Sequence, residues 1–207
     1  MYVNLRRYPK ITADKEAIHD SVQNELLPQL REQEGFKGYC AFWDEAGAGV
    51  SVSVFADQEA AHRSTDTARQ WVMRHHDFFP ERGEEFSGAC IAYETAHKVE
   101  QEGGGGGAQS LFVLIRELDN VPGTQDTRAF VEQRTLPMIT RSPGFRGVYT
   151  VRSDREGSRA AVVTLFDSER EAVACHEKAV ELLGEGLPRV TVTRVLKGQS
   201  VLLVVGD

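Results

Sequence analysis

Leu27-Pro28 followed by Gly35-Phe36-Lys37-Gly38 decides the fold, because the pattern returns as Leu136-Pro137 and Gly144-Phe145-Arg146-Gly147. The two copies lie 109 residues apart in a chain of 207 residues. A second match follows in the same order, with Val54-Phe55-Ala56-Asp57 corresponding to Leu165-Phe166-Asp167-Ser168. Self-similarity of this kind indicates that one structural unit occurs twice.

A glycine run separates the two copies. Residues 103–107 are five consecutive glycines, and ordering so many glycines in a helix or strand costs too much backbone entropy. We therefore expect a first unit over residues 1–101, a Gly-rich linker over 102–109 and a second unit over 110–207.

The first copy shows a helix interrupted by proline. Apolar residues recur at every fourth position from Ile18 to Leu30, which predicts an amphipathic helix with Thr12 as its N-cap. Pro28 falls inside this pattern, so we expect the helix to kink or restart there, and Pro137 repeats the feature. The other elements expected in this copy are strands over residues 2–8, 39–43, 50–55 and 86–93 and a helix over residues 57–76.

The order strand, helix, strand, strand, helix, strand is typical of the ferredoxin-like unit. We expect the second copy to begin with a strand over residues 111–118 and to close with one over 190–196. An additional strand over 201–205 is expected after a turn at Lys197-Gly198, extending an adjacent sheet edge. The predicted fold class is therefore α+β, with two tandem ferredoxin-like βαββαβ units.

Composition excludes several classes of protein. The net charge is −7 and basic residues are interleaved with acidic ones, so we expect no binding to nucleic acid. The longest apolar runs are far shorter than the roughly 20 residues that a membrane helix needs, so no membrane span is expected. Three cysteines without CxxC spacing and a charged N-terminal stretch favour a cytoplasmic protein with reduced thiols.

Four features together resemble a known family. They are the strand ending Arg6-Arg7-Tyr8, the LeuPro…GlyPhe-x-Gly motif, a strand ending in Phe55 before an Ala-rich helix, and Trp71 near the end of that helix. The pattern is similar to the antibiotic biosynthesis monooxygenase family of the dimeric α+β barrel superfamily. In such proteins sheets pack in pairs, which implies an intrachain pseudo-dimer of barrel type here, with a homodimer as a further option.

The resemblance also implies a function. Some members of the family are monooxygenases that use no cofactor and oxidise a small aromatic, quinol-like substrate. By position, Asn4 would hold the oxyanion of the substrate, His75 would act as base, and Trp71 would complete the catalytic set. Tyr8 and His76 are the matching candidates for substrate binding. We expect no metal site, because the histidines lack a spacing that lets them share one ion.

A second reading assigns these residues to packing. Trp71 and His75 are four residues apart on the apolar stripe of a helix, as core residues often are. The protein would then be a non-catalytic small-ligand-binding or assembly module of the same fold. Haem degradation is disfavoured, because Ser64 stands near the position where that resemblance requires tryptophan. In the second copy, positions near Val113 and Leu182 lack the polar candidates, so we expect any working pocket in the first copy.

Overall fold

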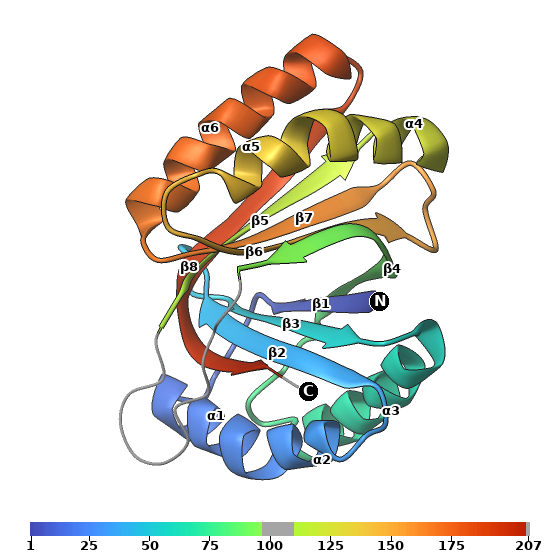
Figure 1. Cartoon of the computed structure of the whole chain (residues 1–207). Helices are drawn as coiled ribbons and strands as arrows, with labels where there is room; N and C mark the ends of the chain where they lie inside the picture. The colour runs from blue at the N-terminus through green and yellow to red at the C-terminus, as the bar shows by residue number, and fades with distance from the viewer. Residues whose placement is uncertain (97–109, 206–207) are drawn as a thin grey trace. The chain divides into compact units, whose positions relative to one another are not determined.

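The computed structural model describes residues 1–96 and 110–205 of the chain (Figure 1). The predicted linker over 102–109 lies outside these residues. Among the described residues, contacts define two compact units, each of which is described by itself. Unit 1 comprises residues 1–87 and 200–205, and unit 2 comprises residues 88–96 and 110–199.

Unit 1 is an antiparallel sheet with helices against one face (Figure 1). Strand β3 lies between β1 and β2, and the last residues of β8 pair with the other edge of β2. Its elements are β1 (Tyr2–Tyr8), α1 (Lys15–Ser21), the π-helical turn η1 (Val22–Leu26), α2 (Leu27–Arg31), β2 (Phe36–Trp43), β3 (Gly49–Phe55), α3 (Gln58–Arg74) and the start of β4 (Glu84–Thr95).

Unit 2 repeats this order of elements. Its strands are arranged β8-β5-β7-β6-β4, all antiparallel. The elements are β5 (Phe112–Asp119), α4 (Thr124–Phe130), η2 (Val131–Thr135), α5 (Leu136–Thr140), β6 (Phe145–Ser153), β7 (Ala160–Phe166), α6 (Glu169–Gly186) and β8 (Thr191–Val205). The predicted α+β class is confirmed, and the order of elements βαββαβ occurs twice along the chain.

The end of the chain differs from the prediction. No turn occurs at Lys197-Gly198, and a single strand, β8, runs from Thr191 to Val205. Its first part pairs with β5 in unit 2, and its last part pairs with Gly38–Phe42 of β2 in unit 1. Because both parts find a partner edge, the lone glycine is accommodated inside the strand.

The first helix begins later than predicted. Asp14, rather than Thr12, is the N-cap, and its Oδ1 accepts from the backbone N of Ala17 at 2.8 Å. The backbone N of Thr12 instead donates to the carbonyl of Phe78 at 3.1 Å, which holds Thr12 in the preceding loop. The aspartate gains from the positive end of the helix dipole as well as from the capping bond.

The predicted break at the prolines is confirmed in both units. A π-helical turn, η1 or η2, immediately precedes a new α-helix whose first turn contains Pro28 or Pro137. A proline in the first turn costs little, because an N–H there has no acceptor within its helix. The sequence thus restarts the helix at the same point of each unit.

The Gly-Phe motifs fasten the helix to the sheet. Gly35 and Gly144 have φ of +87° and +68°, in the left-handed region that favours glycine after a helix. Their carbonyls accept from Ala56 N at 2.7 Å and Asp167 N at 2.9 Å, at the end of the hairpin. The following phenylalanine packs edge-on against Phe55 in unit 1 and against Phe166 in unit 2. The two motifs therefore make equivalent contacts.

Candidate functional site

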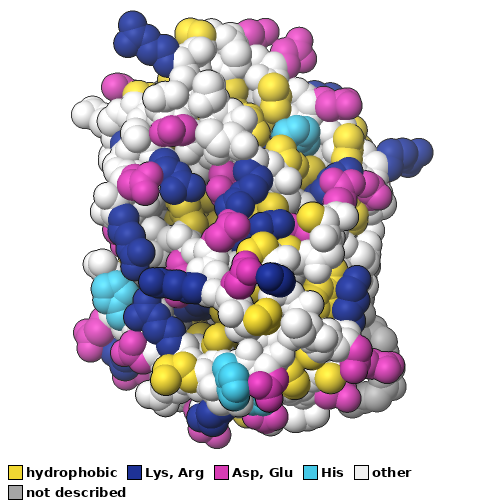
Figure 2. Space-filling view, turned by 180° about the vertical axis from the view of Figure 1, so that it is seen from behind, with side chains coloured by type: hydrophobic (Ala, Val, Ile, Leu, Met, Phe, Trp, Pro, Cys, Tyr) yellow, Lys and Arg dark blue, Asp and Glu magenta, His cyan; other side chains and the backbone are white. Residues whose placement is uncertain are grey.

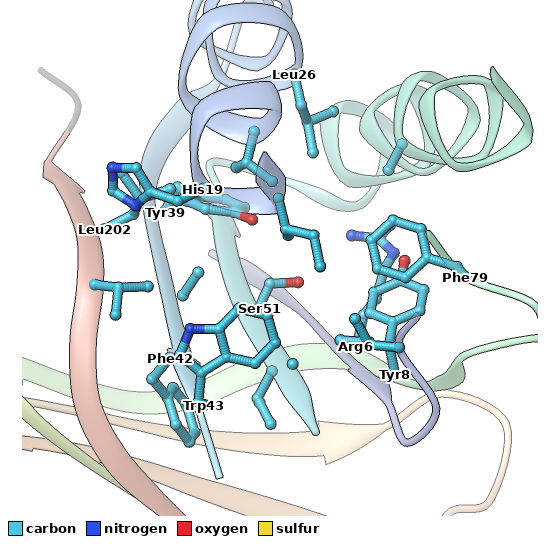
Figure 3. Close-up of a pocket in the computed structure, with 18 of the residues that line it drawn as sticks. Arg6, Tyr8, His19, Leu26, Tyr39, Phe42, Trp43, Ser51, Phe79 and Leu202 are labelled. Carbon is cyan, nitrogen blue, oxygen red and sulfur yellow. The ribbon is translucent and has the colours of Figure 1, made fainter. Parts of the chain in front are cut away.

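Unit 1 contains a cavity between its sheet and its helices (Figure 3). Its volume is about 70 Å³, several times the roughly 10–15 Å³ that one water needs on the same measure. Residues from β1, β2, β3, α1, α3 and the end of β8 line it. Most are apolar or aromatic; the polar and aromatic ones are Arg6, Tyr8, His19, Tyr39, Phe42, Trp43, Ser51, Trp71 and Phe79.

The lining of the cavity includes an arginine and two tyrosines. Arg6 and Tyr8 alternate along β1 and therefore share a face of the sheet, and Tyr39 comes from β2. Arg6 is 7% exposed, and its Nη2 donates to Thr65 Oγ1 on α3 at 2.9 Å. The guanidinium is thus held in place from the helix side.

The two phenols remain protonated at neutral pH. Burial raises the pKa of Tyr8 and raises the pKa of Tyr39 strongly. The positive charge of Arg6 opposes both pKa shifts, as does a hydrogen bond from Ser51 at Tyr39. The lining therefore offers one cation and two O–H donors.

Trp71 forms part of the cavity lining, as its predicted role requires. The side chain is 2% exposed, and its Nε1 has no hydrogen-bond acceptor within the described part of the chain. The ring lies 4.8 Å from that of His75 and 5.5 Å from that of Phe79, measured between centroids. A buried N–H without an acceptor is uncommon and is available to a bound molecule.

His75 contacts the ring of Trp71 but is not among the residues that line the cavity. Its Nδ1 is 2.9 Å from the carbonyl of Trp71, and its Nε2 is 2.9 Å from Ser21 Oγ. Glu25 Oε2 lies 3.3 Å from the same Nε2. The imidazole thus joins the end of α3 to α1 and η1, and both ring nitrogens are occupied.

Asn4 is buried and faces α3. Its Nδ2 donates to the carbonyl of Ala61 at 3.1 Å and is 3.3 Å from Ser64 Oγ. Asn4 is absent from the cavity lining, because these bonds hold its amide against the helix. His76 is also outside the cavity: its side chain is 77% exposed and its Nε2 is 2.9 Å from Asp77 Oδ1. Of the five predicted site residues, the structure therefore brings Tyr8 and Trp71 together at the cavity.

Sequence reasoning missed Arg6, Tyr39, His19 and Ser51. The available signal for Arg6 was the alternation of β1, which gives Arg6 the same face as Asn4 and Tyr8. A charged residue on the face that carries the core is unusual. His19 is the one histidine in the lining, and no sequence pattern marked it.

The described part of the chain contains neither a candidate metal site nor a candidate membrane-spanning helix. Residues 1–96 and 110–205 contain no group of three or more His, Cys, Asp or Glu side chains placed to hold a metal ion. In the same ranges, no helix combines the length and apolar character needed to cross a membrane. Figure 2 shows Lys and Arg side chains lying among Asp and Glu over the face in view.

The sequence matches no protein-family model and has no significant match among curated proteins. The fold, in contrast, matches solved structures along the whole chain. A provisionally named monooxygenase from Fusobacterium nucleatum subsp. nucleatum gives a TM-score of 0.74 at 13% identity, covering 99% of this chain and 94% of that one. A second protein provisionally named as a monooxygenase, from Lactobacillus acidophilus, gives 0.70 at 10% identity, covering 99% and 95%.

A third neighbour is described as an anthrone oxidase-like protein. Its TM-score is 0.62 at 13% identity, and the match covers 100% of this chain and 93% of the neighbour. These neighbours have the dimeric α+β barrel fold, so the resemblance predicted from the sequence is confirmed at the level of the fold. At such low identity, the activity has to be argued from the cavity itself.

Proposed function

We propose that the chain is a cofactor-independent monooxygenase that binds a small aromatic, phenolic substrate in the cavity of unit 1. The observation that supports this proposal is the presence of Arg6, Tyr8 and Tyr39 in the lining of a mainly apolar cavity. Such a cavity suits a ligand that combines a flat apolar body with one oxygen able to carry negative charge.

This lining favours the deprotonated substrate. A phenolate or enolate oxygen beside Arg6 gains a charge-assisted hydrogen bond, and the protonated hydroxyls of Tyr8 and Tyr39 can donate to the same oxygen. Because the surroundings are apolar, these interactions are stronger than in water. The substrate anion is therefore stabilised, and an electron-rich anion is the species that reacts with dioxygen.

The proposed reaction converts a ring CH₂ group and O₂ into a ring carbonyl and water. His19 accepts the proton that leaves the substrate, since it is the one imidazole in the lining. The anion adds dioxygen at carbon to give a peroxide, and loss of water from that peroxide leaves the carbonyl. Trp71 Nε1–H is free to donate to the peroxide oxygen. The fold also occurs in the neighbour described as anthrone oxidase-like, which fits this substrate class.

Asn4 and His75 take positioning roles in this proposal. Asn4 fixes β1, and hence Arg6, against α3 through Ala61. His75 holds the backbone of Trp71 through its Nδ1. Tyr8 and Trp71 keep their predicted contacts with substrate, whereas His76 has none because it points to solvent. We also propose that the two units pair within one chain or that two chains form a homodimer. Measuring the molar mass of the protein in solution tests whether it is a homodimer.

A non-catalytic ligand-binding module is the second candidate. The observation that favours it concerns Asn4 and His75, which already have protein hydrogen-bond partners. In this case the cavity would bind the aromatic ligand without turnover.

Oxygen uptake with anthrones and hydroquinones distinguishes the two candidates. Arg6→Met removes the cation, and we expect a loss of about 100-fold in kcat, as for the removal of other oxyanion donors. Arg63→Met is the matched control, because Arg63 lies on the exposed side of α3 in an ion pair with Glu59. Thermal stabilisation by these aromatics without oxygen uptake would support the binding module and overturn the monooxygenase. If these aromatics cause neither thermal stabilisation nor oxygen uptake, the proposal that the cavity binds this class of ligand is wrong.

A further inference from the structure

Unit 2 has a cavity of its own, of about 40 Å³, between its sheet and helices. One arginine, Arg116, lines it. Tyr2 pairs with Phe55 in unit 1, and Phe112 pairs with Phe166 in unit 2, so the register makes Arg116 the counterpart of Arg6. The same register aligns Asn4 with Leu114, which is adjacent to Val113 and so agrees with the prediction. An arginine thus faces the cavity at the same position in both units.

Arg116 lacks a negative partner. Its side chain is 2% exposed, and Nη1 has no hydrogen-bond partner within the described residues. No carboxylate of residues 1–96 or 110–205 forms an ion pair with it. Burial lowers the pKa of Arg116, and a hydrogen bond with the thiol of Cys175 opposes that shift. In unit 1, by contrast, Thr65 accepts a hydrogen bond from Arg6.

The adjacent glutamate does not compensate this charge. Glu117 lies next to Arg116 on β5, and neighbouring residues of a strand face opposite sides of the sheet. Its carboxylate pairs with Arg194 at 2.7 Å and with Arg159 at 3.5 Å. Burying a guanidinium without a counter-charge is costly, so an arginine in this setting indicates that an anion completes the site.

We propose that the cavity of unit 2 binds a small aliphatic carboxylate, whose carboxylate group pairs with Arg116. A guanidinium matches a carboxylate with two parallel hydrogen bonds. The rest of the lining is mainly aliphatic, including Leu118, Val131, Ile139 and Leu183, with Phe130 as its one aromatic ring. Leu118 occupies the position of Tyr8, and no tyrosine is among the residues that line this cavity. The pocket therefore suits one charged head and a flexible apolar chain.

Calorimetric titration with butanoate, hexanoate and octanoate tests the proposal, with hexanamide as the neutral analogue. We expect hexanoate to bind at least about tenfold more tightly than hexanamide, because hydrogen bonds to a charged group are stronger than those to a neutral one. The fluorescence of Trp43 and Trp71 should stay unchanged, because both tryptophans line the cavity of unit 1. Equal affinity for hexanoate and hexanamide, or no measurable heat with any of the three carboxylates, would overturn the proposal.

Arg116→Met provides the second test. It should abolish carboxylate binding and raise the melting temperature of the ligand-free protein, because a buried unpaired charge is replaced by an apolar side chain of similar length. Arg63→Met and Arg6→Met should retain carboxylate binding. Retained binding in Arg116→Met, or its loss in Arg6→Met together with a change in tryptophan fluorescence, would contradict the assignment to unit 2. If Arg116→Met does not fold, the difference in affinity between hexanoate and hexanamide for the unmodified protein tests the proposal by itself.

Discussion

Replacing Gly35 with alanine should destabilise unit 1 more than the same change at Gly47. Gly35 and Gly47 have positive φ, +87° and +80°. An alanine at either position would therefore be destabilised by about 1–2 kcal/mol in the left-handed conformation. A Cβ at Gly35 would lie 2.9 Å from the Cβ of Ala60, a buried atom of α3, whereas nothing lies within 4 Å of a Cβ at Gly47. Overpacking adds about 1–3 kcal/mol at Gly35.

We therefore expect a loss of about 2–5 kcal/mol in the free energy of unfolding for Gly35→Ala and about 1–2 kcal/mol for Gly47→Ala. Urea unfolding followed by tryptophan fluorescence is the assay, because Trp43 and Trp71 both report on unit 1. Adding Ala60→Gly to Gly35→Ala should recover part of the difference by removing the contacting methyl group. Equal losses for the two single variants would refute the argument that the Gly35 loop is packed against α3.

Two further predictions concern alkaline pH and helix caps. Burial raises the pKa of Cys40 to about 12, so its stabilising contribution is complete below its unfolded pKa and declines as pH rises toward 12. On account of Cys40, the free energy of unfolding should be about 1–2 kcal/mol smaller at pH 10 than at pH 8, and Cys40→Ala should remove that share of the pH dependence. An unchanged slope in that variant would contradict the pKa shift. Asp57→Ala and Ser168→Ala each remove the N-cap of a long helix and should cost about 1 kcal/mol in chemical unfolding; losses below a few tenths would contradict the capping geometry.

The repeat and its elements could be predicted because they depend on local signals. Positive φ at Gly35 and Gly144 and the helix restarts at Pro28 and Pro137 follow from the covalent chemistry of glycine and proline. Such constraints act within a few residues and need no knowledge of the rest of the chain.

The site was harder to predict because it depends on which groups a side chain meets across the fold. Asn4 and His75 have suitable chemistry, yet Ala61 and Ser21 occupy their hydrogen-bonding groups. Arg6 and Tyr39 come from different strands, and their proximity follows from the sheet rather than from their spacing in sequence. The continuous β8 was missed for a similar reason: the pairing of its two parts outweighs the turn signal of Lys197-Gly198.

The pairing of β2 with the end of β8 has a consequence during synthesis. Gly38–Phe42 of β2 hydrogen-bonds with Ser200–Val205, and all the described residues of unit 2 are translated between these two segments. Until the ribosome has released residues 200–205, one edge of the unit 1 sheet has unpaired backbone groups, and such edges promote aggregation. Unit 1 therefore begins to form first along the chain but is completed last, so a nascent chain released early would carry an unprotected β2 edge.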